Sequence, residues 1–471
     1  MAAAIGSGAQ GSGDHWSSRT AFVLASIGSA VGLGNLVRFP AEAGANGGAA
    51  FVLFYMFCVV LIGIPLLLSE TLIGRHGQAA APASYRKLAV ESGASPRWEW
   101  VAGIGVFSST LVLGFYCVLG GWVLYYIGIF AGDLAATGVS GTAFQGMSDD
   151  AVEGLFPALI GNGPLTVTLD VAFLLITLAF VARGVSGGIE KAAVWLMPAF
   201  FVLMLGITMY GATGGHFMDA ANYLFKFEPE KLTGPVMLAA VGQAFFSLSL
   251  GMACMVTYGS YVGRDVNLAR SSGIIAGSDT LVAMVAGLCI FPIVFAAGLA
   301  PEGGLGLMFQ TLPHAFQDMP FGSLIGLLFF IMVAFAALTS SISLLEVPTA
   351  WLIDKFGLRR IAASIIIAFA GLVLGVLSAL STGMLAWFHP LDIVPLFADK
   401  GVMDVLDIFT SRLTMPITAL LTCIFIGWVA DRRLVDSESG LGSGAHQVWR
   451  FLVRWVCPVA LLAILWVGLT S

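Results

Sequence analysis

A repeated pattern of long apolar segments limits the fold of this chain more than any other feature of its sequence. Each segment has roughly 20 mostly apolar residues, the length that an α-helix needs to cross the ~30 Å hydrocarbon core of a membrane. Only 10% of the residues are charged, against about 25% in a typical soluble domain, and the mean hydropathy is +0.94. The sequence therefore predicts an all-α polytopic membrane protein and excludes a soluble fold.

About eleven of these segments are long enough to be membrane spans. They cover residues 17–44, 48–76, 98–130, 165–183, 189–212, 235–262, 269–299, 323–354, 360–381, 402–431 and 447–469. The first is counted as a span and not as a secretory signal, because it is too long for a signal and no basic region precedes it. Residues 1–13 are mostly small and polar, so they are expected to form a disordered tail.

Arginine and lysine residues between the spans predict the orientation of the chain. Most of them follow an even number of spans, and loops rich in these cations are retained in the cytoplasm. They are Arg75, Arg86, Lys87, Arg97, Arg183, Lys191, Arg264, Arg270, Lys355, Arg359, Arg360, Arg432 and Arg433. We therefore expect a plasma-membrane or inner-membrane protein with a cytoplasmic N-terminus and, for an odd number of spans, an extracellular or periplasmic C-terminus.

Several classes of function are excluded by what the sequence does not contain. The net charge of −6 is spread over the loops, so no nucleic-acid partner is expected. The six cysteines lie far apart in apolar segments and are interpreted as packing residues, while the six histidines show no metal-ligand spacing. The sequence has no nucleophile elbow or phosphate-binding loop, so the protein is not expected to be an enzyme.

Two of the predicted spans contain sequence that favours a broken helix. Residues 28–35 read Gly-Ser-Ala-Val-Gly-Leu-Gly-Asn, and residues 246–252 read Phe-Ser-Leu-Ser-Leu-Gly-Met. Glycine and serine are poor helix formers. Interruptions at corresponding positions, five spans apart, indicate the substrate site of a transporter, although close packing of small residues is the alternative explanation.

Four ionisable residues within the spans are functional candidates, because a charge at membrane depth is costly unless it is paired or hydrated. Arg38 is expected to pair with Asp407 at the outer end of span 10, either as a gate or as a solvated rim pair. Asp279 requires a cation or a proton, whereas Glu70 is interpreted as a structural acid. Glu346 either bonds to a broken helix or carries a proton.

Three consecutive hydroxyl residues, Thr339, Ser340 and Ser341, lie in the otherwise apolar eighth span. Hydroxyl and carbonyl oxygens suit a hard cation such as Na⁺. Serine and threonine in a helix also bond back to a carbonyl one turn earlier. The sequence pattern alone leaves both interpretations open.

Motifs along nearly the whole chain resemble those of the neurotransmitter:sodium symporter family. The longest runs from Trp16 to Pro40 and includes the broken segment 28–35. Further motifs follow in the family's order: Asn46-Gly47-Gly48, Gly63-Ile64-Pro65 with Glu70, Gly74-Arg75, Phe115-Tyr116 to Trp122, Gly188-Ile189-Glu190-Lys191, Gln243 to Gly251, and Leu338-Thr339-Ser340-Ser341. The chain is identified as a member of this family by its motifs from His15 onward.

The resemblance implies the 5+5 inverted-repeat fold of the leucine-transporter type, with helices 1 and 6 interrupted. The first repeat would comprise residues 14–212, the second residues 235–431, and residues 447–471 would add a further span. Members of the family couple Na⁺ entry to uptake of amino acids or their derivatives by alternating access. A sodium-coupled secondary active symporter without an organic cofactor is therefore expected.

The resemblance also implies two sodium sites. The first, Na1, would consist of Ala30, Asn35, Ser247, Asp279 and the substrate carboxylate. The second, Na2, would consist of the carbonyls of Gly28, Val31 and Ala336 and the hydroxyls of Thr339 and Ser340. Unwound backbone frees carbonyl oxygens for the ions, while half-helix N-termini favour a substrate carboxylate.

The implied substrate site comprises Ser29, Ala30, Leu33, Gly34, Val112, Tyr116, Phe246, Ser247, Ser249, Met252, Ser340 and Leu344. Tyr116 would bind the substrate carboxylate. These residues include no acid for a second amine and no strong cation for an acidic side chain, so a neutral, mainly hydrophobic L-amino acid is expected. Met252 adapts its shape, which favours broad acceptance of such substrates.

The implied gates are the pair Arg38 and Asp407 on the outer side, Phe246 over the pocket, and Trp16 with Asp354 on the inner side. Gly13 stands where the leucine transporter has an arginine of its inner gate. Asp279 replaces an asparagine, and Ala283 replaces a glutamate of the leucine transporter. We therefore expect Asp279 to supply the negative charge that chloride supplies in chloride-dependent relatives, which makes transport chloride-independent.

Two alternatives to sodium symport follow from the same residues. One is a transporter-like sensor that binds an amino acid without moving it. The other is coupling to protons through Glu70, Asp279 or Glu346. The expected partners are the lipid bilayer and the amino acid, and the protein is expected to be a monomer or a weak homodimer.

Overall fold

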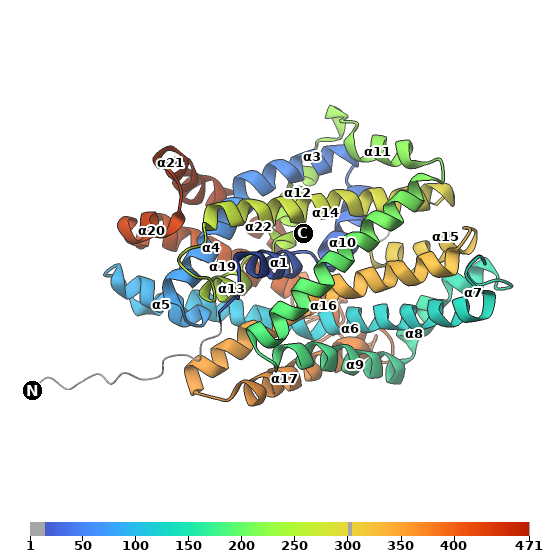
Figure 1. Cartoon of the computed structure of the whole chain (residues 1–471), viewed down its shortest axis with the longest axis horizontal. Coiled ribbons are helices and arrows are strands. Elements are labelled where there is room, and N and C mark those ends of the chain that lie inside the picture. The colour runs from blue at the N-terminus through green and yellow to red at the C-terminus, as the bar shows by residue number, and fades with distance from the viewer. Residues whose placement is uncertain (1–14, 300–303, 471) are drawn as a thin grey trace, which may run out of the picture.

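The computed structural model describes residues 15–299 and 304–470, and the regular elements in these ranges are all helices (Figure 1). The predicted disordered tail, residues 1–13, lies outside the described residues. The all-α prediction is therefore confirmed for the part of the chain that the structure describes.

Nine described helical segments are long and apolar enough to cross a membrane. They are α3–α4 (Ala49–Gly77), α6 with its first turn (Pro96–Thr137), α9 (Gly163–Val181), α10 with its first turn (Val185–Ala212), α14 (Leu268–Ala296), α16 (Gly322–Phe356), α17 (Arg360–Ser381), α18–α19 (Val402–Val429) and α21–α22 (Ser443–Thr470). Each occupies the place of a predicted span, with ends that differ by a few residues.

The two predicted spans with helix-breaking sequence are both divided. The first consists of α1 (Arg19–Ala30) and a second part, Gly34–Ala45, which includes α2 (Phe39–Ala45), and the two parts are bent by 50°. The other consists of α12 (Gly234–Ser247) and the short helix α13 (Cys254–Ser260). By length and apolar composition the described residues thus provide nine spans, or ten with the bent pair.

Short helices occupy the connections that the sequence analysis treated as loops. They are α5 (Ala81–Glu91), α7 (Asp149–Glu153), α8 (Leu155–Gly161), α11 (Phe217–Phe225), α15 (Leu312–Gln317) and α20 (Arg432–Ser439). Figure 1 shows α5, α20 and α21 at one end of the bundle and α7, α11 and α15 at the other. The first group lies at the end where the sequence has its excess of arginine and lysine.

Helix α1 lies inside the bundle, where it packs against α10, α14 and α16 (Figure 1). Large apolar side chains on the outer helices remain exposed, for example Trp195 and Val202 on α10 and Trp466 on α22. Such a surface suits lipid rather than water. The broken helices are therefore enclosed by the longer helices that carry the lipid-facing surface.

Candidate functional site

The two broken helices leave the α-helical conformation at residues whose backbone requires it. Val31 is extended after the end of α1. Between α12 and α13, Ser249, Gly251 and Ala253 have φ angles of 54°, 81° and 60°, a left-handed region that few residues adopt. A Cβ at Gly251 would lie 2.3 Å from the carbonyl oxygen of Met415. Glycine is therefore required there for both conformation and space.

Side chains from other helices satisfy polar groups of the unwound backbone. Glu70 on α4 accepts a hydrogen bond from the backbone N–H of Gly251 at 2.8 Å. Gln243 donates to the carbonyl of Gly34 at 3.0 Å, and Ser249 donates to the carbonyl of Ser29 at 3.0 Å. Unpaired backbone groups are costly inside a membrane protein, so these bonds stabilise the breaks. The last two link the two broken helices directly.

A buried carboxylate cluster lies beside the break in the first span. Asp279 on α14 accepts hydrogen bonds from the side chains of Asn35 at 2.8 Å and Ser247 at 2.6 Å. The hydroxyl of Tyr55 lies 3.4 Å from the same carboxylate. Asp279, Asn35 and Tyr55 are completely buried. The carboxylate of Asp279 contacts neutral groups. When Asp279 is ionised, the cluster therefore carries a negative charge that no cationic side chain in the cluster balances.

A second cluster of oxygen atoms lies where α16 meets the end of α1. The hydroxyl of Ser340 is 3.2 Å from the carbonyl oxygens of both Gly28 and Val31. The neighbouring hydroxyl of Thr339 bonds to the carbonyl of Ala336 at 3.1 Å. The structure thus brings together all five residues of the predicted Na2 set. Their donors are the hydroxyl and carbonyl oxygens that a hard cation prefers.

A cavity of about 480 Å³ lies beside these clusters and extends to the end of the bundle that is predicted to face outward, where Arg38 and Asp407 line it. Leu33, Gly34, Tyr116 and Phe246 line it. The hydroxyl of Tyr116 accepts a hydrogen bond from the N–H of Leu33 at 3.3 Å. A side chain at Gly32 would clash here, because its Cβ would lie 2.7 Å from the Tyr116 hydroxyl and 2.5 Å from that of Ser340.

The other predicted substrate residues lie below this cavity or around it. Ala30 is the buried last residue of α1. Val112 on α6, Met252 in the second break and Leu344 on α16 are all buried. None of these three residues lines the cavity.

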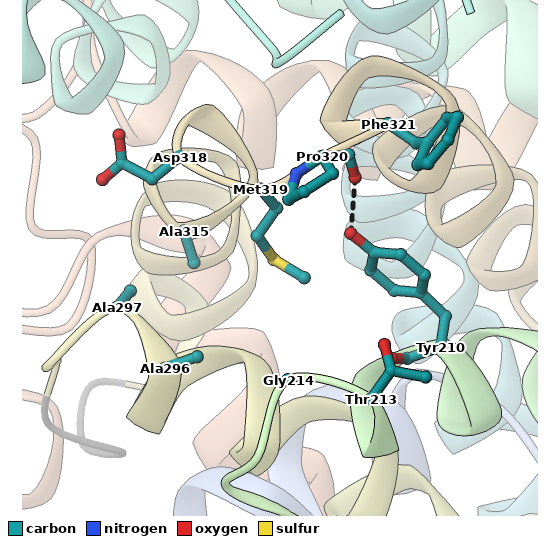
Figure 2. Close-up of a pocket in the computed structure, with 10 residues that line it drawn as sticks. All are labelled: Tyr210, Thr213, Gly214, Ala296, Ala297, Ala315, Asp318, Met319, Pro320 and Phe321. Atoms are coloured by element: carbon teal, nitrogen blue, oxygen red, sulfur yellow. Dashed lines mark hydrogen bonds between the residues drawn. The ribbon is translucent and has the colours of Figure 1, made fainter. Parts of the chain in front are cut away.

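Another cavity, of about 510 Å³, lies at the outer ends of α10, α14 and α15 (Figure 2). The hydroxyl of Tyr210 donates to the carbonyl of Pro320 there. None of the predicted site residues lines it. It is therefore separate from the candidate site.

On the outer side, the arrangement of the predicted gate differs in one contact from the expectation. Arg38 forms its ion pair with Glu42, one turn further along, at 3.7 Å. Its guanidinium also lies 4.5 Å from the ring centre of Phe246. Asp407 lines the same cavity as Arg38. Arg38 and Asp407, the predicted gate, thus line the same cavity. The ion-pair partner of Arg38 is Glu42, which the sequence analysis did not predict.

At the end of the site that is predicted to face inward, the residues that precede α1 contact two other helices. The indole N–H of Trp16 donates to the carbonyl of Tyr258 on α13 at 3.0 Å. The carboxylate of Glu190 on α10 accepts a hydrogen bond from the N–H of Ser17 at 2.9 Å and one from its hydroxyl. These contacts tie α1 to α13 and α10. Asp354, the predicted inner acid, lines a cavity with Arg86 and Lys355 instead.

Glu346 contacts the end of the second broken helix, which is one of the two alternatives that the sequence analysis gave for it, and it also contacts Arg360. Its carboxylate lies 2.7 Å from the guanidinium of Arg360 and accepts a hydrogen bond from the hydroxyl of Tyr261 at 2.6 Å. This ion pair connects α16, α17 and the end of α13. Both charges have a partner, so the pair is a structural connection at the inner end of the bundle.

Sequence reasoning missed three residues that the structure makes prominent. Tyr55 contacts Asp279, and Glu190 contacts Ser17, the neighbour of Trp16. A polar group within a predicted span was the one signal that the sequence gave for either of them. Asp170 on α9 is completely buried, and both of its oxygen atoms lack a hydrogen-bond partner among the described residues. It is an ionisable residue in a predicted span, and the same reasoning that selected Asp279 would have selected it.

The fold and this site define a class of protein: a multi-pass membrane transporter with two broken helices around a central site. The structure is similar to that of MhsT in complex with L-phenylalanine, with a TM-score of 0.85 and 37% identity over 97% of this chain and 99% of that one. The match supports the fold of the leucine-transporter type, and the predicted fold class is confirmed.

The sequence profile of the sodium:neurotransmitter symporter family matches residues 13–138 and 158–471. The sodium-dependent transporter YhdH of Bacillus subtilis is 35% identical over 95% of this chain and 96% of its own length. A sodium-dependent transporter of Haemophilus influenzae is 30% identical over 95% and 96%. The chain belongs to the sodium:neurotransmitter symporter family, and it is a sodium-dependent symporter of that family.

The contact between Glu70 and Gly251 leads to a prediction about the second break. Glu70→Gln keeps an oxygen acceptor for the Gly251 N–H, so it is expected to retain the melting temperature and substrate binding. Glu70→Ala leaves that N–H unpaired, at a cost of ~1–3 kcal/mol, and is expected to lower both. Thermal unfolding in detergent and equilibrium binding of the substrate measure the effect. Glu230→Ala, a change at an exposed residue outside the site, is the control, and equal losses in the glutamine and alanine variants would contradict the prediction.

Proposed function

We propose that the protein is a sodium-coupled symporter of neutral, mainly hydrophobic L-amino acids that binds two sodium ions and does not require chloride. The observation that carries the proposal is the meeting of two oxygen clusters at the broken helices, one with a carboxylate and one without. In this proposal residues 14–212 and 235–431 form the inverted repeats and residues 447–471 the additional span. The N-terminus lies in the cytoplasm, and the C-terminus on the outer side of the cell membrane.

The Asp279 cluster is proposed to be Na1. The Asp279 carboxylate and the Ser247 hydroxyl supply oxygen atoms 2.6 Å apart, and the amide nitrogen of Asn35 donates to both. The amide oxygen of Asn35 accepts a hydrogen bond from the N–H of Gly32 at 3.2 Å. A buried carboxylate without a cationic partner is costly. A sodium ion provides the missing positive charge, and it also attracts the carboxylate of a substrate that binds next to it. Binding of the ion and of the amino acid are thus expected to support each other.

The Ser340 cluster is proposed to be Na2. It has no carboxylate, so the ion is held by dipoles: the hydroxyls of Thr339 and Ser340 and the carbonyls at the end of α1. The carbonyls of Gly28 and Val31 lie at the end of α1, and the carbonyl of Ala336 lies on α16. An ion bound here therefore connects α1 to α16 and stabilises the arrangement in which the inner end is closed.

The substrate is proposed to bind between the two ions, at the bottom of the outer cavity. Tyr116 accepts a bond from Leu33, which leaves its own O–H proton to donate to a carboxylate. Leu33 and Phe246 supply apolar surface for the side chain of the substrate. The complex of the similar protein MhsT with L-phenylalanine supports a neutral amino acid. One methylene group changes the binding free energy by only ~1–3 kcal/mol in such a pocket, so we propose a class of substrates.

Alternating access is proposed to depend on opening one end of the site while the other end is closed. The outer side has an open cavity at Arg38 and Asp407, whereas Trp16, Ser17 and Glu190 close the inner side. Release of substrate to the cytoplasm then requires α1 to separate from α10 and α13. We propose that the protein acts as a monomer or a weak homodimer.

Uptake into proteoliposomes tests the function. A panel of radiolabelled neutral L-amino acids is expected to accumulate with an inward Na⁺ gradient and not when K⁺ or choline replaces Na⁺. Acidic and basic amino acids serve as controls. Uptake driven equally well by a proton gradient would overturn the sodium sites, and saturable binding without uptake would favour a sensor.

The chloride prediction concerns Asp279. Uptake by the wild type is expected to be unchanged when gluconate replaces chloride. Asp279→Asn removes the negative charge while keeping the shape of the side chain and one of its two oxygen atoms, so uptake is expected to fall and to recover in part when chloride is present. Asp219→Asn, at an exposed residue of α11 outside the site, is the matched control. Loss of wild-type uptake in gluconate would show that the carboxylate does not replace the anion.

The inner closure leads to a prediction about Glu190. Hydrogen bonds to a charged group contribute ~1.5–3 kcal/mol, so Glu190→Ala is expected to raise the open-inward population about tenfold or more. The measure is the rate at which a cysteine placed at the buried position Ser26 reacts with a thiol reagent from the cytoplasmic side. The six native cysteines are all buried, which keeps the background low.

The control for this measurement is Glu228→Ala, which breaks an ion pair with Lys231 (2.6 Å) outside the site. The labelling rate of this variant is expected to equal that of the wild type. An unchanged rate in Glu190→Ala would mean that the contact with Ser17 does not hold α1 closed.

A further inference from the structure

A cluster of arginines occupies the end of the bundle where the last two spans meet. It consists of Arg432 at the start of α20, Arg450 in α21 (Ser443–Phe451) and Arg454 one turn later. Figure 1 shows α20 and α21 at the same end of the molecule. Arg450 lies close enough to the other two for their positive charges to repel it. The site described above does not use this cluster.

The acid that faces the cluster does not balance it. Asp436 lies 3.5 Å from Arg432 and also contacts the buried ring of His446. One guanidinium nitrogen of Arg450 and Nε of Arg454 are buried and have no hydrogen-bond partner among the described residues. A buried, unpaired donor on a cation is costly. The three arginines therefore have an excess of positive charge and unused donors.

Aromatic side chains stand next to the unused donors. The guanidinium of Arg454 lies 5.3 Å from the ring centre of Trp428 and 5.8 Å from that of Trp455. The two indoles pack edge to face, with ring centres 5.5 Å apart. Trp428, Trp455 and Phe451 are 41%, 55% and 58% exposed. Tryptophans of this kind lie at the boundary between hydrocarbon and water, so this surface faces lipid headgroups.

We infer that this surface binds an anionic phospholipid, with its phosphate group at Arg450 and Arg454 and its acyl chains along Trp428 and Trp455. A phosphate has several acceptor oxygens and the opposite charge, and arginine binds it in a bidentate manner. Basic pockets beside membrane helices recognise such headgroups. The apolar rings at the same place fit a lipid better than a free anion. The inference rests on the membrane placement of the chain and not on its substrate or sodium sites.

Native mass spectrometry of the purified full-length protein tests the inference. The protein is incubated with equal amounts of phosphatidylglycerol and phosphatidylcholine, and the lipid that stays bound is measured. The wild type is expected to retain phosphatidylglycerol preferentially. Arg450→Gln combined with Arg454→Gln is expected to reduce that retention roughly tenfold or more, as removal of two cations at a membrane surface should. Arg97→Gln, an exposed arginine of the loop before α6, is the matched control and is expected to retain the lipid.

Three results would overturn the inference. Equal retention of the two lipids would show that the headgroup charge is not recognised, and equal retention by the double variant would show that these arginines do not bind it. Stabilisation by millimolar inorganic phosphate as large as that by phosphatidylglycerol would indicate a site for a small anion. The variant with lysine at both positions distinguishes lost binding from lost folding, because it keeps the charge and is expected to retain part of the lipid. Uptake is not a readout, so failure of the proposed transport function leaves this test unaffected.

Discussion

The rest of the structure depends on one constraint: two helices are interrupted inside a membrane, where water cannot satisfy their backbone. Each free carbonyl or N–H must find a partner in another helix, and Glu70, Gln243 and Ser340 supply such partners. The partners also fix the positions of the helices that carry them. The candidate site is therefore part of what makes the fold possible, and the longer helices around it keep it away from lipid.

Buried acids in this chain differ in function because they differ in their partners. Glu346 is paired with Arg360 and Glu70 with a backbone N–H, so both connect helices. Asp279 contacts only neutral groups in its cluster, and that is why it is the proposed site of a cation. Asp170 has no partner among the described residues, and the structure does not explain it. The identity of a buried acid thus says less about its function than the charge of its neighbours does.

The cavity on the outer side is open, whereas contacts join the helices on the inner side. These contacts hold the protein in one state of the proposed transport cycle. Closure of the inner end depends on a few hydrogen bonds from the residues that precede α1, mainly those to Glu190 and Tyr258. A sodium ion between α1 and α16 would add to them. Each contact has a modest free energy, which suits a protein that must break these contacts in every cycle.

The sequence by itself determined the class of fold, the places of the spans and the two helix breaks, because length, apolarity and glycine content are local properties. It also determined the family, since the motifs extend over nearly the whole chain. It could not determine which buried group faces which, and so the contact of Arg38 with Glu42, the link between Ser17 and Glu190 and the ion pair of Glu346 with Arg360 were not predicted. Those contacts join residues of different helices, and only the tertiary structure decides them because helix packing sets the distances. The arginine cluster at the last two spans shows the same limit: the sequence counts its charges, but only the packing of α20 against α21 leaves some of their donors without a partner.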